Sequence, residues 1–490
     1  MKNNQVFVHL SNTFDYPLPP FDPSKHFPEL ESLGNVVSGL DPKNNVYNHI
    51  RETLLGVGLD KEHQGSPDWN PYHNLIQPGQ TVVIKPNLVK GNHPLGKIGV
   101  KSMITQAAVI RPIIDYLLLA TNKNVNIIIA DVPLQSSDWD EIIRGSQLKD
   151  LVEYYKSKGI NIPLLDLRKE ISHQNKYGVI NKRDFKDRDP LGYTIVDMKD
   201  KSRLMPVIDK SSKFRITDYG KGTVPPHHNK DRNEYYICNT ILSADLLINV
   251  PKLKSHRKAG LTSAMKNLIG INGDKRWLAH HRAGSPKQGG DEFYKKNAWM
   301  YFKWHFFDLL KRSRWTIPIA TLIRKYYEKL VLKQTMEEAA LKTNPSLKNV
   351  MEGSWYGNDT IWRCIIDLNN IILFADKSGH LHQTPQRKYF CLVDGLLGGE
   401  GEGPMEQTPK ESGVILVGTN PVAMEFISAK IMGFDWNKIP HIRESFTEQF
   451  FPLTGFKPND ISIISNSDQT QSLNLKFKPS AGWAGHIELE

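Results

Sequence analysis

The sequence predicts an α/β fold, doubly wound, with mainly parallel sheets in two lobes and a cleft between them. Apolar runs bounded by Gly, Pro and Asp alternate with segments whose apolar residues recur at helical spacing. The chain has 490 residues, more than the roughly 100–200 of a typical domain, which predicts two or more lobes. Hydrophobic residues make up 39% and charged residues 23%, a balance typical of a globular protein with an ample core.

The first βαβ unit is predicted in the N-terminal half. Residues 81–87 form an apolar strand that ends in Lys-Pro-Asn, and residues 125–131 form the next parallel strand. Between them, residues 106–120 have helical spacing, with Thr105 as the predicted N-cap. A third strand is predicted at 160–167.

The C-terminal part repeats the same alternation. A helix is predicted at 360–374, strands at 388–394 and 414–418, and a helix at 421–432 that begins with proline. These elements predict a second set of strands and helices of the same class.

Composition predicts three parts: 1–75, an N-terminal extension with a first strand and helix; 76–355, an α/β lobe that carries a Lys/His loop; and 356–490, a C-terminal α/β lobe with a glycine-rich acidic loop. Two insertions interrupt the middle part. Residues 170–235, rich in Lys, Asp and Pro, predict short antiparallel strands. Residues 297–342 predict helices with many aromatics, either an amphipathic surface for a membrane or partner or, as aromatic burial favours, ordinary core.

Charge and cysteine content restrict the function classes. With 63 Lys+Arg against 52 Asp+Glu the net charge is +11, which suits anionic small molecules, nucleic acid or a membrane surface, and equally a merely basic surface. The three scattered cysteines exclude a disulfide framework and a self-contained Fe–S cluster. Because no apolar stretch is long enough for a transmembrane segment or a signal peptide, we expect a cytoplasmic protein.

The segment 251–270 is the strongest functional candidate. It follows the apolar run 246–250. Lys252, Lys254 and His256 stand at every second position, and Lys266 and Asn267 follow ten residues later. In an extended chain the alternating side chains share one side, and the small residues after them predict a helix whose N–H groups point at a bound anion. We therefore expect these cations to bind an anion and His256 to exchange protons. The plain alternative is a solvated basic loop.

Two neighbouring predicted strands end in polar residues followed or preceded by proline. Lys85 and Asn87 are placed to bind a carboxylate or phosphate, and Asp131 to bind a hydroxyl, hold a metal-bound water or accept a proton. A solvent-exposed lysine and a loop-capping aspartate are the alternatives.

A glycine-rich acidic stretch at 397–404 follows the strand at 388–394. Gly399 and Gly401 leave the backbone open to a cofactor, and Glu400 is a candidate acid/base opposite the basic segment. A flexible loop is the alternative.

His280 and His281, beside acidic residues and together with Asp394, are candidate metal ligands. Adjacent residues point in different directions in regular structure, so one of the two histidines is expected to be a bystander.

The order of these segments resembles the bacterial and archaeal family called domain of unknown function 362. The matching pieces are 81–89, with Ile-Lys-Pro-Asn-Leu; 247–270, with Pro-Lys-Leu-Lys-x-His and Met-Lys-Asn-Leu-Ile-Gly; 393–404; and 419–434. Many members carry a ferredoxin-like cluster module, which three scattered cysteines cannot supply.

A more distant likeness is to nickel-pincer-dependent lactate racemase. The spacing of His256 and Lys266 is similar to a proton-transfer histidine and a cofactor-tethering lysine, and His280 or His281 falls near a nickel-binding histidine. Where the racemase has a second catalytic histidine, this chain has Asp131-Val132-Pro133. The likeness supports the fold more than the reaction.

The leading hypothesis is an enzyme that binds an anionic substrate or phosphorylated cofactor between its lobes, with racemase-, epimerase- or lyase-like proton transfer. The sequence does not decide between a divalent metal and a nucleotide-derived cofactor, and a homo-oligomer is one of the alternatives for the assembly. The alternative is a non-catalytic protein that binds an anion, nucleotide or glycan precursor. The tight clustering of the cations disfavours nucleic acid as the partner.

Overall fold

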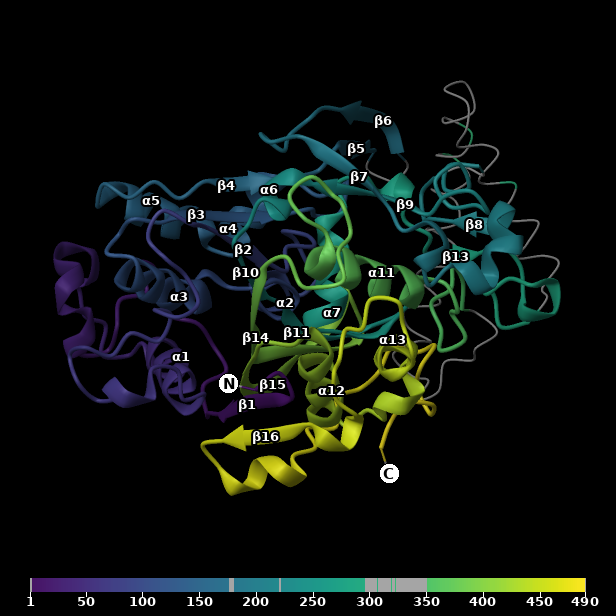
Figure 1. Cartoon of the computed structure of the whole chain (residues 1–490). Helices are drawn as coiled ribbons and strands as arrows, with labels where there is room; N and C mark the ends of the chain where they lie inside the picture. Colours follow the sequence, from purple (N-terminus) through teal and green to yellow (C-terminus); the bar gives the residue numbers. More distant parts are fainter. Residues whose placement is uncertain are drawn as a thin grey trace.

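The structure is a computed structural model that describes residues 2–175, 180–219, 222–295 and 350–489, together with Phe306, Ile319 and Leu322. Its centre is a ten-stranded sheet with helices on both faces (Figure 1). The predicted α/β class with a mainly parallel sheet is thereby confirmed. The aromatic helices predicted at 297–342 lie outside the described residues, apart from the three single positions.

The large sheet has the strand order β16-β1-β15-β14-β10-β2-β3-β4, and β11 and β12 extend it beside β14. In chain order its strands are β1 (Gln5–Leu10), β2 (Thr81–Pro86), β3 (Asn126–Asp131), β4 (Leu164–Asp166), β10 (Leu246–Val250), β11 (Lys252–His256), β12 (Gly260–Thr262), β14 (Lys388–Glu402), β15 (Glu406–Gly418) and β16 (Ser462–Ser465). Neighbours from β14 through β10, β2 and β3 to β4 run parallel. Strand β15 pairs antiparallel with β14 and with β1.

Each face of the sheet buries its own hydrophobic core. Along β2, Val82 and Ile84 belong to one core and Val83 to the other, as the two-residue period of a strand requires. One face is covered by α1 (Asn45–Gly56), α2 (Gly96–Met103), α3 (Ala107–Ala120), α4 (Trp139–Gly145) and α5 (Leu148–Ser157). The other is covered by α6 (Asn239–Leu242), α7 (Ala264–Asn267), α11 (Ile361–Phe374), α12 (Pro421–Met432) and α13 (Pro440–Arg443).

Three small two-stranded sheets lie outside the large one. They pair β5 (Glu170–Gln174) with β6 (Ile180–Phe185), β7 (Tyr193–Asp197) with β9 (Glu234–Cys238), and β8 (Phe214–Arg215) with β13 (His281–Arg282). All three pairs are antiparallel. The short antiparallel strands predicted for 170–235 are therefore confirmed.

Several predicted boundaries are wrong. Thr105 does not cap α3, because its hydroxyl donates to the carbonyl of Val250 at 2.7 Å and Gln106 occupies the N-cap position. The strand predicted at 160–167 is reduced to β4. The glycine-rich stretch predicted as a loop is the second half of β14, since its backbone pairs with β15 as far as Glu402.

Within the described ranges, no single helix is long and apolar enough to cross a membrane. The bent pair α2 and α3 passes that test by length and composition, and nearly all of α3 is buried in the core.

Candidate functional site

A cavity of about 600 Å³ opens where β2, β3 and β10 end. Lys85 and Pro86 end β2, Asp131 ends β3, and the chain leaves β10 through Pro251 into β11. Strands β3 and β10 flank β2 on opposite sides, so the strand order reverses here. Open α/β sheets bind their ligands at such a reversal, beyond the carboxyl ends of the strands.

The floor of the cavity holds a buried ion pair. Lys85 Nζ donates to Asp131 Oδ1 at 2.6 Å, and both side chains are buried. Asp131 also accepts hydrogen bonds from the backbone N–H groups of Leu88 (2.7 Å) and Val132 (2.8 Å). Gly270 covers the pair, and a Cβ there would lie 2.5 Å from Asp131 Oδ1 and 2.7 Å from Lys85 Nζ. Asp131 thus neutralises and orients Lys85, with two hydrogen bonds accepted at Oδ1 and one at Oδ2.

A chain of asparagine side chains connects the end of β2 to β10 through α7. Asn87 Nδ2 donates to Asn267 Oδ1 at 2.8 Å, and Asn267 Nδ2 donates to Asn249 Oδ1 at 2.8 Å. Asn87 Oδ1 is buried without a hydrogen-bond partner among the described residues. The chain therefore orients Asn87 and Asn267, both of which line the cavity.

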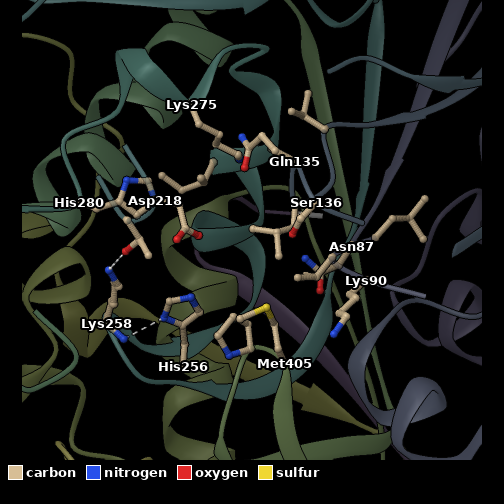
Figure 2. A pocket seen from close by; sticks show the side chains of 18 of the residues that line it. Asn87, Lys90, Gln135, Ser136, Asp218, His256, Lys258, Lys275, His280 and Met405 are labelled. Carbon is tan, nitrogen blue, oxygen red and sulfur yellow. Dashed lines mark hydrogen bonds between the residues drawn. The ribbon is translucent and has the colours of Figure 1, made fainter. Parts of the chain in front are cut away.

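His256 is held in one tautomer by the hairpin between β11 and β12. Gly260, at φ +84°, permits the tight return, which brings the N–H groups of Lys258 (3.1 Å) and Ala259 (3.2 Å) onto His256 Nδ1 (Figure 2). Because Nδ1 accepts, the proton of the neutral ring is on Nε2. Burial, followed by the charges of Lys266 and Lys254, lowers the pKa of His256 well below its usual range. His256 is thus a neutral N–H donor toward the cavity.

Three lysines line the cavity without an ion pair or a hydrogen-bond acceptor among the described residues, Lys90, Lys266 and Lys275. Burial and then the charge of Lys275 lower the pKa of Lys266 to about 7. Burial also lowers the pKa of Lys275 to about 8. Lys258, whose ammonium donates to Thr217 Oγ1 at 2.9 Å, has its pKa lowered by burial to about 8.

The lining as a whole is strongly basic. Eight of its side chains are cationic, against three carboxylates, Asp131, Asp218 and Glu406. The cations are Lys85, Lys90, Arg183, Lys254, Arg257, Lys258, Lys266 and Lys275. A concave surface of one sign concentrates ligands of the opposite sign.

Comparison with known proteins relates this segment to a family. Residues 205–430 match the family model described as Domain of unknown function (DUF362). This part of the chain, somewhat less than half of it, is similar to the DUF362 family. It contains β11, His256, Lys266 and His280, whereas Lys85 and Asp131 precede it.

A crystal structure of a protein from Thermotoga maritima aligns with 74% of the chain at 11% identity and a TM-score of 0.30. The chain spans about half, 53%, of that protein's length. The search of curated proteins gave no match.

Two residues predicted to bind the ligand or a metal instead neutralise each other within the matched residues 205–430. Lys252 Nζ donates to Asp394 Oδ2 at 3.1 Å and to the hydroxyl of Tyr16 at 2.5 Å. Tyr16 in turn donates to Asp394 Oδ1 at 2.6 Å. Neither Lys252 nor Asp394 lines the cavity. Lys254, two residues on, does line it, although its ammonium donates to the carbonyl of Met103 at 2.6 Å.

The glycine-rich acidic stretch does not face the basic segment across a cleft. It lies beside β11 in the sheet, with Lys254 opposite Gly399. A Cβ at Gly399 would lie 2.5 Å from Gln407 Cγ, so this glycine serves close packing, and the N–H of Gly401 donates to the Lys478 carbonyl. Glu400 accepts from the N–H of Lys478 at 3.1 Å and does not line the cavity.

The candidate metal ligands do not converge. His280 lines the cavity (Figure 2). His281 instead lies beside Glu292, with 3.9 Å between Nε2 and Oε1. Asp394 is already paired with Lys252. Among the described residues, the group of three potential metal ligands that does come together is elsewhere, at His9, His49 and Glu52.

The helix expected to point its N–H groups at an anion is short and already occupied. It is α7, four residues long, and the N–H of Met265 donates to Oε2 of the buried Glu425 at 2.8 Å. The protein supplies its own carboxylate, so α7 adds no anion site.

Arg183, Thr217 and Asp218 complete the cavity wall and were missed in the sequence. They come from the insertion at 170–235, whose weak periodicity carries no signal of position. Asn249, which orients Asn267, was hidden as a polar residue within an apolar strand.

Proposed function

We propose that this protein is an enzyme that binds an anionic substrate, bearing a carboxylate or phosphate group, in the cavity and transfers a proton at the bound molecule. The observation behind the proposal is the pair of ammonium groups, Lys266 and Lys275, that reach the cavity without a carboxylate partner among the described residues. Positive charge that the protein leaves unneutralised in a partly enclosed site is offset by a ligand anion.

The proposed division of labour follows from the hydrogen bonds. His256, with its proton on Nε2, would donate to a ligand oxygen and stabilise negative charge that develops there. Lys266, whose pKa is lowered to about 7 mainly by burial, would take up and release the proton, because an acid/base group works best near the ambient pH. This assigns proton transfer to Lys266 and not, as expected from the sequence, to His256, Asp131 or Glu400.

Binding is tested with phosphate and pyrophosphate as probes. At constant ionic strength they should raise the melting temperature of the wild-type protein, and Lys266→Met and Lys275→Met should reduce the shift. Lys156→Met, an exposed lysine on α5, is the matched control and should leave the shift unchanged. An equal shift in all four proteins would contradict the proposal.

Proton transfer is tested in D₂O. The protein is incubated with a panel of small carboxylates and phosphate monoesters, and deuterium incorporation is read by mass spectrometry. We expect incorporation with the wild type and none with Lys266→Met. Lys266→Arg keeps the charge and should retain binding while losing exchange, because guanidinium does not deprotonate. Binding without exchange in every protein would instead identify a non-catalytic anion-binding protein.

A further inference from the structure

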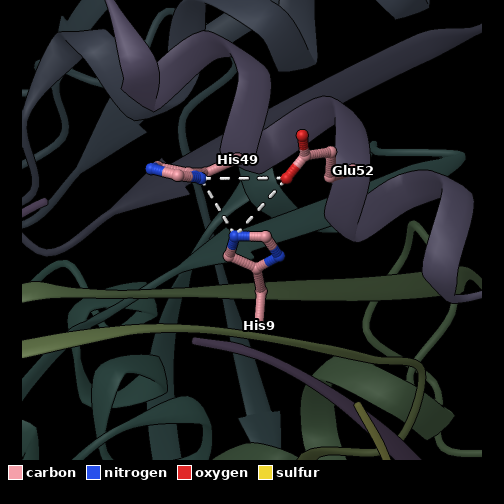
Figure 3. A group of neighbouring side chains, drawn as sticks. All are labelled: His9, His49 and Glu52. Atoms are coloured by element: carbon pink, nitrogen blue, oxygen red, sulfur yellow. Dashed lines mark hydrogen bonds and ion pairs between the residues drawn. The ribbon is translucent and has the colours of Figure 1, made fainter. Parts of the chain in front are cut away.

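A second cluster of chemically active side chains lies between β1 and α1, apart from the cavity. His9 projects from β1, and His49 and Glu52 project from one face of α1, three residues apart (Figure 3). His9 Nε2 lies 3.0 Å from His49 Nδ1 and 3.8 Å from Glu52 Oε2, and His49 Nδ1 lies 3.9 Å from the same oxygen. Two imidazole nitrogens and one carboxylate oxygen therefore face one another.

These three separations match the size of a transition-metal ion. The point equidistant from the three atoms lies about 2.1 Å from each of them, within the ranges of about 2.0–2.1 Å for Zn–N and 2.0–2.2 Å for Zn–O. The 3.0 Å contact is a hydrogen bond between the two histidines, and Glu52 Oε2 lies within ion-pair distance of both rings.

The three ligand atoms, and the hydrogen bond that orients one of them, also suit a transition-metal ion. Imidazole nitrogens with one carboxylate are ligands for Zn²⁺, Co²⁺ or Ni²⁺, whereas Mg²⁺ and Ca²⁺ prefer oxygen. His49 Nε2 lies 3.0 Å from Thr13 Oγ1, so its N–H has an acceptor while Nδ1 is directed at the centre of the cluster.

Access and rigidity differ between the two sides of the cluster. His9 is 2% exposed and sits on β1, which pairs with β15 on one side and β16 on the other. Glu52 is 57% exposed and opens the cluster to solvent. An ion can therefore enter from solvent, and water can complete its coordination.

We propose that His9, His49 and Glu52 form a binding site for a divalent transition-metal ion of the Zn²⁺ class, which joins β1 to α1. Three protein ligands from a rigid strand and one helix face leave a fourth position for water. Bound metal would stabilise the N-terminal strand and helix against separation.

The test uses Co²⁺ as a spectroscopic probe of the metal-free full-length protein, with Zn²⁺ competition. We expect one saturable equivalent with visible absorption bands and a rise in melting temperature. Glu52→Gln, on an exposed side chain, and His49→Ala should weaken binding by at least about 10–100-fold, the loss typical of removing even an outer partner of a ligand. His26→Ala, an exposed histidine elsewhere, is the control and should bind as the wild type does.

Two results would overturn the proposal: no Co²⁺ bands in the wild type, or equal affinity in the wild type, Glu52→Gln and His49→Ala. Because Glu52 is exposed, the Glu52→Gln variant is expected to fold. The test is therefore decisive even if His49→Ala fails to fold.

Discussion

The backbone N–H of Lys258 donates to Nδ1 of His256 at 3.1 Å, and this contact decides which atom of the histidine faces the cavity. A second N–H, from Ala259, donates to the same nitrogen at 3.2 Å. Two donors on Nδ1 exclude a proton there, so Nε2 carries it. A histidine held in this way offers a hydrogen bond from Nε2, but a second proton would have to go to Nδ1 and would break both contacts.

The first prediction concerns this tautomer. Nitrogen-15 NMR of the histidine-labelled protein should show His256 neutral at pH 7 with its proton on Nε2, since burial and nearby lysines lower its pKa. His256→Leu removes the donor and should reduce turnover by about 100–1,000-fold, as loss of one oxyanion donor does. His256→Gln keeps an N–H donor and should lose less. An imidazolium at pH 7, or a proton on Nδ1, would contradict the assignment.

The second prediction concerns stability and pH. The pKa of Lys266 falls from 10.5 to about 7 on folding, chiefly through burial. Between these values the unfolded chain holds a proton that the folded protein lacks, so this group makes stability rise with pH, by up to about 1.4 kcal/mol per pH unit. Urea unfolding between pH 7 and 10 should show a smaller slope for Lys266→Met than for the wild type, and higher stability at pH 7.

Lys156→Met is the control for this experiment, because that exposed side chain lies outside the cavity. Its slope should equal that of the wild type. Identical slopes for all three proteins would show that the Lys266 amine keeps its ordinary pKa.

The third prediction concerns Gly270. A Cβ at this position would lie 2.5 Å from Asp131 Oδ1 and 2.7 Å from Lys85 Nζ, so Gly270→Ala should force the ion pair apart. We expect a loss of about 1–3 kcal/mol of stability, as in other overpacked interiors, and weaker phosphate binding. Gly455→Ala has open space around its Cβ and should change neither. Wild-type stability in Gly270→Ala, measured by urea unfolding, would refute the packing argument.

The fourth prediction separates a positioning role for Asp131 from a catalytic one. Asp131→Asn leaves Lys85 buried without a counter-charge and should destabilise the protein by about 3–5 kcal/mol. The double variant Lys85→Met, Asp131→Asn should regain much of that loss, because neither charge then stays unpaired. A catalytic Asp131 would predict lost deuterium exchange with unchanged unfolding free energy, and that pattern would contradict our assignment.

Strand interiors were predictable and strand ends were not. The apolar runs that became β2, β3 and β10 are dense in Val, Ile and Leu, which buried parallel strands require. The second half of β14 is rich in glycine, which is depleted in strands, and it becomes a strand only because β15 pairs with it. Thr105 has the chemistry of an N-cap, yet its hydroxyl donates a hydrogen bond to the carbonyl of Val250, which is distant in sequence.

The sequence alone determined that lysines, asparagines and a histidine follow the ends of neighbouring strands, because parallel strands align their carboxyl ends whatever the rest of the chain does. Only the tertiary structure decided which of those lysines have a carboxylate partner. Asp131 neutralises Lys85 from 46 residues away and Asp394 neutralises Lys252 from 142 residues away, whereas Lys266 and Lys275 form no ion pair among the described residues. Electrostatic interaction depends on distance in space and on burial, and residue spacing along the chain specifies neither.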